Sequence, residues 1–110
     1  MSLRYVKDGV EFSPCTTDLV DGIIAATRIL YKYGTDLVVT SGSDGVHPAG
    51  GTNDPHYKGY AFDLRTRDIK VTDVPTVVRD LRLAMPGWVI VQEETHIHCQ
   101  CQKFKDPLAV

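Results

Sequence analysis

The stretch WVIVQEETHIHCQCQ, residues 88–102, decides the fold. Its first part, Trp88–Val91, is a short apolar run, and its second part, His96–Gln102, alternates histidine or glutamine with apolar or thiol side chains. Both patterns are typical of β-strands. The intervening residues, Glu93–Thr95, predict a turn, and strands joined by a short turn pair antiparallel. The sequence therefore predicts an antiparallel sheet, which with the helices described next indicates an α+β fold.

Apolar residues at helical spacing predict a first helix over Asp18–Tyr33. Thr17 is placed to cap its start, and Gly34 is a natural stop at its end. A second helix is predicted over Val74–Met85, with Pro75 in its first turn. Its cap is Thr72 or Asp73.

The remaining elements complete a small sheet with about two helices packed on one side. Buried or half-buried strands are predicted at Asp36–Thr40 and Tyr60–Thr66, and the start of the chain, Tyr5–Phe12, is a short edge strand or a hairpin. Between the strands predicted at Asp36–Thr40 and Tyr60–Thr66, the segment Ser41–Pro55 is rich in glycine and proline. A loop of this length in so small a domain is typically functional.

Length and composition exclude several classes of protein. The 110 residues make a single domain, 1–110, because a second hydrophobic core would not fit. The chain has no apolar run near 18 residues, and its first residues lack the apolar region of a signal peptide. A net charge of -2 argues against a protein whose main function is to bind the phosphates of nucleic acids. We therefore expect a protein that is cytoplasmic or phage-associated and monomeric, with neither nucleic acid nor membrane as its partner.

The three cysteines fit this view of the compartment. Cys99 and Cys101 would lie two residues apart on one strand, which is a poor arrangement for a disulfide, and Cys15 is then left over. We interpret all three as reduced. The alternation of the strand also predicts that Cys99 and Cys101 face the core, away from His98.

Three of the four histidines lie in two clusters, His56-Tyr-Lys-Gly-Tyr-Ala-Phe-Asp63 and Glu93-Glu-Thr-His-Ile-His98. Zinc prefers imidazole nitrogen and carboxylate oxygen, and a catalytic site has three protein ligands. One histidine and Asp63 from the first cluster, with one histidine from the second, supply that set. Residues two apart on a strand face the same side, so His96 and His98 project together. A histidine beside a strand is often merely hydrogen-bonded, but the two clusters together predict a zinc site.

The pattern HxxGxAxD followed by HxH resembles a zinc metallopeptidase superfamily. This superfamily includes bacterial and phage D-alanyl-D-alanine carboxypeptidases and the signalling domain of hedgehog proteins. The stretch Gly50–His56 resembles the glycine-rich approach to the first ligand in the carboxypeptidases, whereas Val39–Asp44, His56–Gly59 and His96–Cys99 resemble hedgehog more closely. The similarity covers about residues 37–102. It implies a hedgehog-like or peptidase-like fold.

The resemblance also implies roles for particular residues. His56, Asp63 and His98 would be the zinc ligands, with His96 beside the metal as a catalytic residue that stabilises an oxyanion or orients its neighbours. Glu93 would be the general base, with Glu94 as the alternative. Some relatives carry a glutamate three residues before the ligating histidine, and that register would make His96 the ligand instead. Candidates for contacts with the substrate are Ser41, Asp44, His47 and Tyr57.

One departure concerns the substrate carboxylate. Many of the carboxypeptidases carry an arginine where this chain has Ser43-Asp44, and Arg65 or Arg67 is the available substitute. The resemblance implies a zinc-dependent peptidase that acts on bacterial cell-wall stem peptides or muropeptides. It would be either a D-Ala-D-Ala carboxypeptidase or an L-Ala-D-Glu endopeptidase. The alternative is a catalytically inactive, zinc-stabilised hedgehog-like binding module or phage structural protein.

Overall fold

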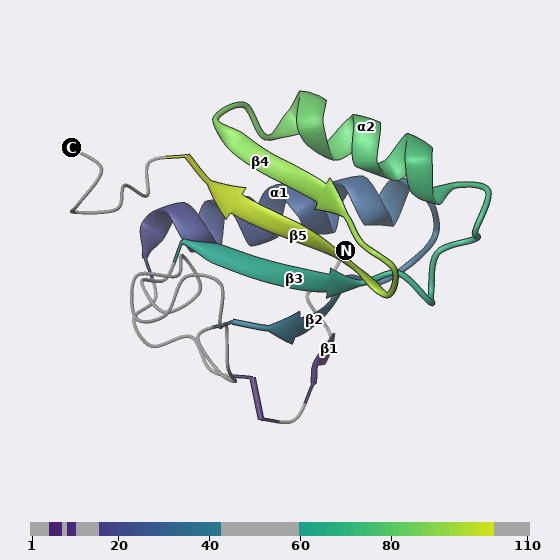
Figure 1. Ribbon diagram of the computed structural model, residues 1–110, viewed down its shortest axis with the longest axis horizontal. Helices are drawn as coiled ribbons and strands as arrows, with labels where there is room; N and C mark the ends of the chain where they lie inside the picture. Colours follow the sequence, from purple (N-terminus) through teal and green to yellow (C-terminus); the bar gives the residue numbers. More distant parts are fainter. Residues whose placement is uncertain (1–4, 8, 11–15, 43–59, 103–110) are drawn as a thin grey trace.

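The computed structural model describes residues 5–7, 9–10, 16–42 and 60–102 (Figure 1). The chain is a small α+β fold with two helices and one five-stranded sheet in the order β1-β2-β3-β5-β4. The four strands β2 to β5 pair antiparallel, and β1 pairs parallel to β2 at one edge. The bounds are β1 Tyr5–Val6, α1 Thr17–Lys32, β2 Val38–Ser41, β3 Ala61–Arg65, α2 Val74–Ala84, β4 Trp88–Gln92 and β5 His96–Cys101. The predicted fold class is confirmed.

Helix α1 begins one residue earlier than predicted, and its cap is Thr16 rather than Thr17. The Thr16 side-chain oxygen accepts a hydrogen bond from the Leu19 backbone N–H at 3.0 Å. Both threonines can cap a helix, so sequence alone does not separate them. The helix ends as predicted, before Gly34, whose φ of 70° lies in the left-handed region that favours glycine.

Helix α2 begins after Asp73, one of the two caps predicted for it. Asp73 stands at the N-cap position, although its side chain makes no capping hydrogen bond. Pro75 lies in the first turn, where a missing backbone N–H removes no helical hydrogen bond. The buried residues of α2 recur at helical spacing, and all of them join the core: Val74, Val77, Val78 and Leu81.

Both helices pack on one face of the sheet (Figure 1). Their apolar faces meet side chains that alternate along the strands, including Phe62 and Leu64 of β3 and Ile97 and Cys99 of β5. Trp88 packs edge-on against Phe62, with ring centroids 5.9 Å apart, and is a partly buried side chain at the border of the core. The opposite face of the sheet, turned away from α1 and α2, is called here the site face.

The edge strand and the loop predictions have different outcomes. The predicted element near the start of the chain is a two-residue edge strand, β1, and the Lys7 backbone N–H continues its pairing by donating to the Val39 carbonyl at 3.0 Å. The predicted long loop lies outside the described residues beyond Gly42. Within the described ranges, no helix combines the length and the apolarity needed to cross a membrane.

Candidate functional site

The two central strands bring the predicted site residues together on the site face. Strands β3 and β5 are antiparallel neighbours, and their register places Asp63 opposite His98 and Arg65 opposite His96. Side chains two apart on a strand share a face, so all four lie on the face away from the helices. The thiols of Cys99 and Cys101 are buried, as the alternation predicts. Burial raises the pKa of the Cys99 thiol far above its usual value.

Asp63 and His98 form the closest contact of the site. The Asp63 Oδ1 atom lies 2.9 Å from His98 Nδ1, and the two side chains are 13% and 19% exposed. The hydrogen bond to Asp63 raises the pKa of His98 above its usual 6.5, although partial burial acts in the opposite direction. A second hydrogen bond, from His98 Nε2 to Gln100 Oε1 at 3.1 Å, adds to the rise. Both ring nitrogens of His98 are therefore held by oxygen atoms.

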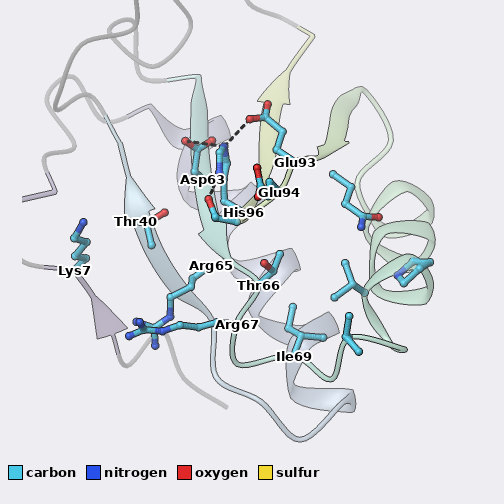
Figure 2. Close-up of a pocket in the computed structure, with 15 residues that line it drawn as sticks. Lys7, Thr40, Asp63, Arg65, Thr66, Arg67, Ile69, Glu93, Glu94 and His96 are labelled. Atoms are coloured by element: carbon cyan, nitrogen blue, oxygen red, sulfur yellow. Dashed lines mark hydrogen bonds and ion pairs between the residues drawn. The ribbon is translucent and has the colours of Figure 1, made fainter.

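His96 and Glu93 form a second pair beside the first. The Glu93 Oε2 atom lies 2.9 Å from His96 Nε2, and Asp63 Oδ2 lies 3.8 Å from the same nitrogen (Figure 2). The turn explains this contact, since the Glu93 backbone N–H donates to the His96 carbonyl at 2.9 Å and closes the hairpin. Glu93 is 47% exposed and His96 is 28% exposed. Asp63 thus lies between the two histidines, with one carboxylate oxygen toward each.

The chemistry of the Asp63–His98 pair suits a metal ion. An imidazole nitrogen and a carboxylate oxygen, half-buried and facing each other at 2.9 Å, are the donor types that zinc takes in proteins. Two of the three predicted ligands are therefore in contact, and the third, His56, lies outside the described residues. Within the ranges that the structure describes, no group of three or more His, Cys, Asp or Glu side chains is arranged to hold a metal ion.

The other predicted site residues are placed as follows. Ser41 ends β2 and is the register partner of Asp63, so it lies at the same end of the sheet. Glu94 is exposed and lines the cleft described next, together with Glu93. The remaining predicted substrate contacts, Asp44, His47 and Tyr57, lie outside the described residues.

A cleft of about 790 Å³ opens beside the two pairs (Figure 2). Asp63, Glu93 and His96 form part of its wall. Two further groups also line the cleft, an apolar group (Ile69, Val71, Val74 and Pro75) and a basic group (Lys7, Arg65 and Arg67). In Figure 2 the side chains of Arg65 and Arg67 extend toward the side of the cleft where Lys7 and Thr40 lie. The cleft therefore joins a basic wall to the carboxylate and imidazole groups.

The three cations of the basic wall are not equivalent. Arg65 is tied to Asp68 by two hydrogen bonds, Nε to Oδ2 at 2.6 Å and Nη2 to Oδ1 at 3.0 Å. Within the described part of the chain, neither Arg67 nor Lys7 forms an ion pair, and both are exposed. Arg67 and Lys7 are thus the cations available to an anionic group that enters the cleft.

Sequence reasoning missed two residues of this region. Gln100 could have been found, because it stands two positions after His98 on a predicted strand and must share its face. Lys7 gave no such signal. It reaches the cleft because β1 pairs with β2, a contact between segments more than thirty residues apart in the sequence.

Comparison with known proteins adds no relative to this description. Protein-family models, curated proteins and solved structures were each searched, and none matches this chain.

Proposed function

We propose that this protein is a zinc-dependent peptidase that cleaves a peptide bond in bacterial cell-wall stem peptides. The observation that carries the proposal is the pairing of Asp63 with His98 next to the pairing of Glu93 with His96, where Asp63, Glu93 and His96 line one cleft. The first pair supplies ligand chemistry and the second supplies a carboxylate for proton transfer. The resemblance of both sequence motifs to zinc peptidases points to the same activity.

The proposed zinc ligands are His56, Asp63 and His98. The contact between the last two favours His98 over His96 as the ligand, because His98 Nδ1 lies 2.9 Å from Asp63 whereas His96 Nε2 lies 3.8 Å from it. When bound, the zinc ion would polarise the scissile carbonyl and make water a better nucleophile at neutral pH. The remaining steps belong to side chains of this chain.

Glu93 is the proposed general base. Its carboxylate is partly exposed to the cleft and is held by His96 at 2.9 Å, so it can accept a proton from the attacking water and later deliver it to the leaving amine. Glu94 lines the same cleft, but it is Glu93 that contacts the histidine. Once Glu93 is protonated it attracts the His96 N–H less strongly. His96 can then donate to the oxyanion that develops on the substrate.

The basic wall of the cleft supports a substrate with a carboxylate. Stem peptides carry several carboxylates, and one of them would lie against Arg67 and Lys7, the two cations that no described acidic residue neutralises. The apolar group of the cleft, Ile69, Val71 and Val74, is suited to short aliphatic side chains such as alanine.

The experiment that tests the proposal is digestion of purified muropeptides by the zinc-loaded protein, with products read by mass spectrometry. A chelator-treated sample and a Glu93→Gln variant serve as controls. Loss of one D-Ala that both controls abolish identifies a carboxypeptidase, and a cut between L-Ala and D-Glu identifies an endopeptidase. A protein that binds zinc without cleaving any muropeptide is the binding module instead. A protein that binds no zinc removes the basis of the proposal.

A further inference from the structure

Gln100 is placed to control which ring nitrogen of His98 faces Asp63. The Gln100 Oε1 atom lies 3.1 Å from His98 Nε2, while Asp63 Oδ1 lies 2.9 Å from His98 Nδ1. Gln100 follows His98 by two residues on β5, so both lie on the site face. The neighbouring strands present Ala61 and Val89 opposite Gln100. Neither of these two aliphatic side chains can take the place of the amide oxygen as an acceptor.

The hydrogen-bonding rules of the amide and the imidazole determine the direction of this contact. An amide oxygen accepts and does not donate, so the hydrogen atom between the two side chains must be carried by His98 Nε2. In a neutral imidazole one nitrogen carries the hydrogen atom and the other has the lone pair. The Asp63 carboxylate is also an acceptor, so in the metal-free protein Nδ1 carries a hydrogen atom as well and donates it to Asp63. Metal binding requires the loss of one of these hydrogen atoms. If Nε2 keeps its hydrogen atom on Gln100, the lone pair offered to a metal is on Nδ1, the nitrogen that faces Asp63.

We propose that Gln100 is a positioning residue that fixes the tautomer and ring orientation of His98, so that Nδ1 and the Asp63 carboxylate are presented together to a zinc ion. This inference rests on the proposed function, because it concerns the same zinc site. Histidines that bind metals usually donate their second ring N–H to an acceptor of this kind, and loss of the acceptor weakens metal binding about 10-fold to 100-fold. The inference also assigns Nδ1 as the ligand atom of His98.

Zinc affinity tests the inference without recourse to activity. The purified 110-residue chain is stripped of metal and titrated with zinc in competition with a chromophoric chelator. Gln100→Leu keeps a similar volume and removes the acceptor, so its Kd for zinc should rise about 10-fold to 100-fold. Gln100→Glu restores an acceptor and should bind zinc at least as tightly as the wild type. Gln102→Leu, an exposed position just after β5, is the matched control and should leave the Kd unchanged.

Two further measurements keep the outcomes separate. Thermal unfolding of the metal-free variants shows whether each one is folded before its Kd is compared. Nitrogen chemical shifts of the histidine rings, measured by long-range proton–nitrogen NMR on the zinc-bound wild type, should show zinc on Nδ1 and hydrogen on Nε2 of His98.

Each result then counts against a particular claim. Equal Kd values for the wild type and a folded Gln100→Leu variant would overturn the inference while leaving the proposed function standing, and so would zinc on Nε2. If the wild type binds no zinc at all, the proposed function fails first, and the role of Gln100 toward zinc fails with it.

Discussion

Asp63 is the residue on which the site converges. One of its carboxylate oxygens contacts His98, and the other lies on the side of His96, whose Nε2 also contacts Glu93. A carboxylate with two oxygens can satisfy two neighbours at once, which a single hydroxyl or amide oxygen at this position could not do with the same charge. The two histidines and Glu93 therefore form one connected group, and a change at one member is expected to be felt by the others.

Replacing Glu93 with glutamine separates proton transfer from zinc binding. Glutamine keeps the shape of the side chain but cannot accept the proton, so turnover of a muropeptide substrate should fall by about 10²-fold to 10⁴-fold. Zinc content, measured by atomic emission, should stay at the wild-type level because Glu93 is not a proposed ligand. Glu94→Gln is the control and should keep most of the activity. Full activity in Glu93→Gln would remove Glu93 from the mechanism.

Replacing Arg67 with alanine tests the basic wall of the cleft. If Arg67 binds a substrate carboxylate, KM for a muropeptide should rise about tenfold while kcat changes little, as expected when a charge-assisted hydrogen bond is lost. Arg67→Lys should recover part of the effect. Arg28→Ala, an exposed arginine on α1, is the control for the change in net charge. An unchanged KM would show that the carboxylate is bound elsewhere.

At the scale of single elements, helix α1 is shaped by its contact with Trp88. A Cβ atom at Gly22 would lie 2.4 Å from Trp88 Cζ2 and 2.5 Å from Cη2, closer than unbonded carbon atoms approach. Trp88 is in turn held against Phe62 in the core. The glycine thus lets α1 approach β4 closely enough for the indole to pack, even though glycine weakens a helix.

Gly22→Ala should therefore destabilise the protein, although alanine favours the helix by about 1 kcal/mol. The added methyl group must displace Trp88, and overpacking of this kind costs about 1–3 kcal/mol. The free energy of unfolding from urea titration measures the balance. In a Trp88→Ala background the clash is absent, so there the same substitution should be neutral or stabilising. If Gly22→Ala is equally destabilising in both backgrounds, the indole contact is not the reason for the glycine.

The elements differ in how far the sequence could predict them. Both helices and strands β2 to β5 follow from local periodicity, and their predicted ends are within about two residues of those observed. The sequence also predicts which side chains of β5 share a face of the sheet, because alternation along a strand puts His96 and His98 on one face and Cys99 and Cys101 on the other. The parallel partner of β1 could not be predicted from local sequence, since parallel pairing depends on contacts between distant segments.

In the candidate site, too, the residues could be predicted from the sequence, whereas their contacts depend on how distant segments pair. The motifs pointed to Asp63 and His98, but their contact depends on β3 and β5 being neighbours with one particular register. Choosing Glu93 over Glu94 required the hairpin geometry, which directs the Glu93 carboxylate to His96. The cleft could not be predicted from the sequence, because its wall comes from four separate parts of the chain, around Lys7, Thr40, Asp63–Pro75 and Gln92–His96.

At the scale of the whole molecule, a hydrogen bond joins the two helices. The Tyr33 hydroxyl at the end of α1 donates to Asp80 Oδ2 in α2, and Arg79 also pairs with Asp80. The hydrogen bond from Tyr33 is the main cause that lowers the pKa of Asp80 below its usual 3.8, and the same bond raises the pKa of Tyr33 above 10.0. The end of α1 and helix α2 are therefore joined by a hydrogen bond that depends on the protonation states of Tyr33 and Asp80.

The pH dependence of stability should report this bond. Asp80 has a lowered pKa in the folded state, so its contribution is present above its usual pKa of 3.8 and is lost as the pH falls through the folded value. Tyr33 has a raised pKa, so its contribution is present below 10.0 and is lost as the pH rises through the folded value. Tyr33→Phe should therefore lower Tm at neutral pH, and its difference from the wild type should shrink in strong acid.

Tyr31→Phe is the matched control for this measurement, because Tyr31 is 63% exposed on the same helix. Its Tm should follow the wild type throughout the pH range. A constant difference between Tyr33→Phe and the wild type from pH 2 to pH 7 would contradict the assigned role of Asp80.

The position of β5 in the sheet has a consequence for the order in which the molecule is made. β5 follows every other described element in the sequence, yet it lies between β3 and β4. During synthesis on the ribosome, the first four strands and both helices emerge while the strand that joins β3 to β4 is still missing. The sheet and the Asp63–His98 contact can close only after residue 98 has left the exit tunnel. Until these residues have emerged, the nascent chain therefore has Asp63 without its partner His98, and an unpaired β3 edge.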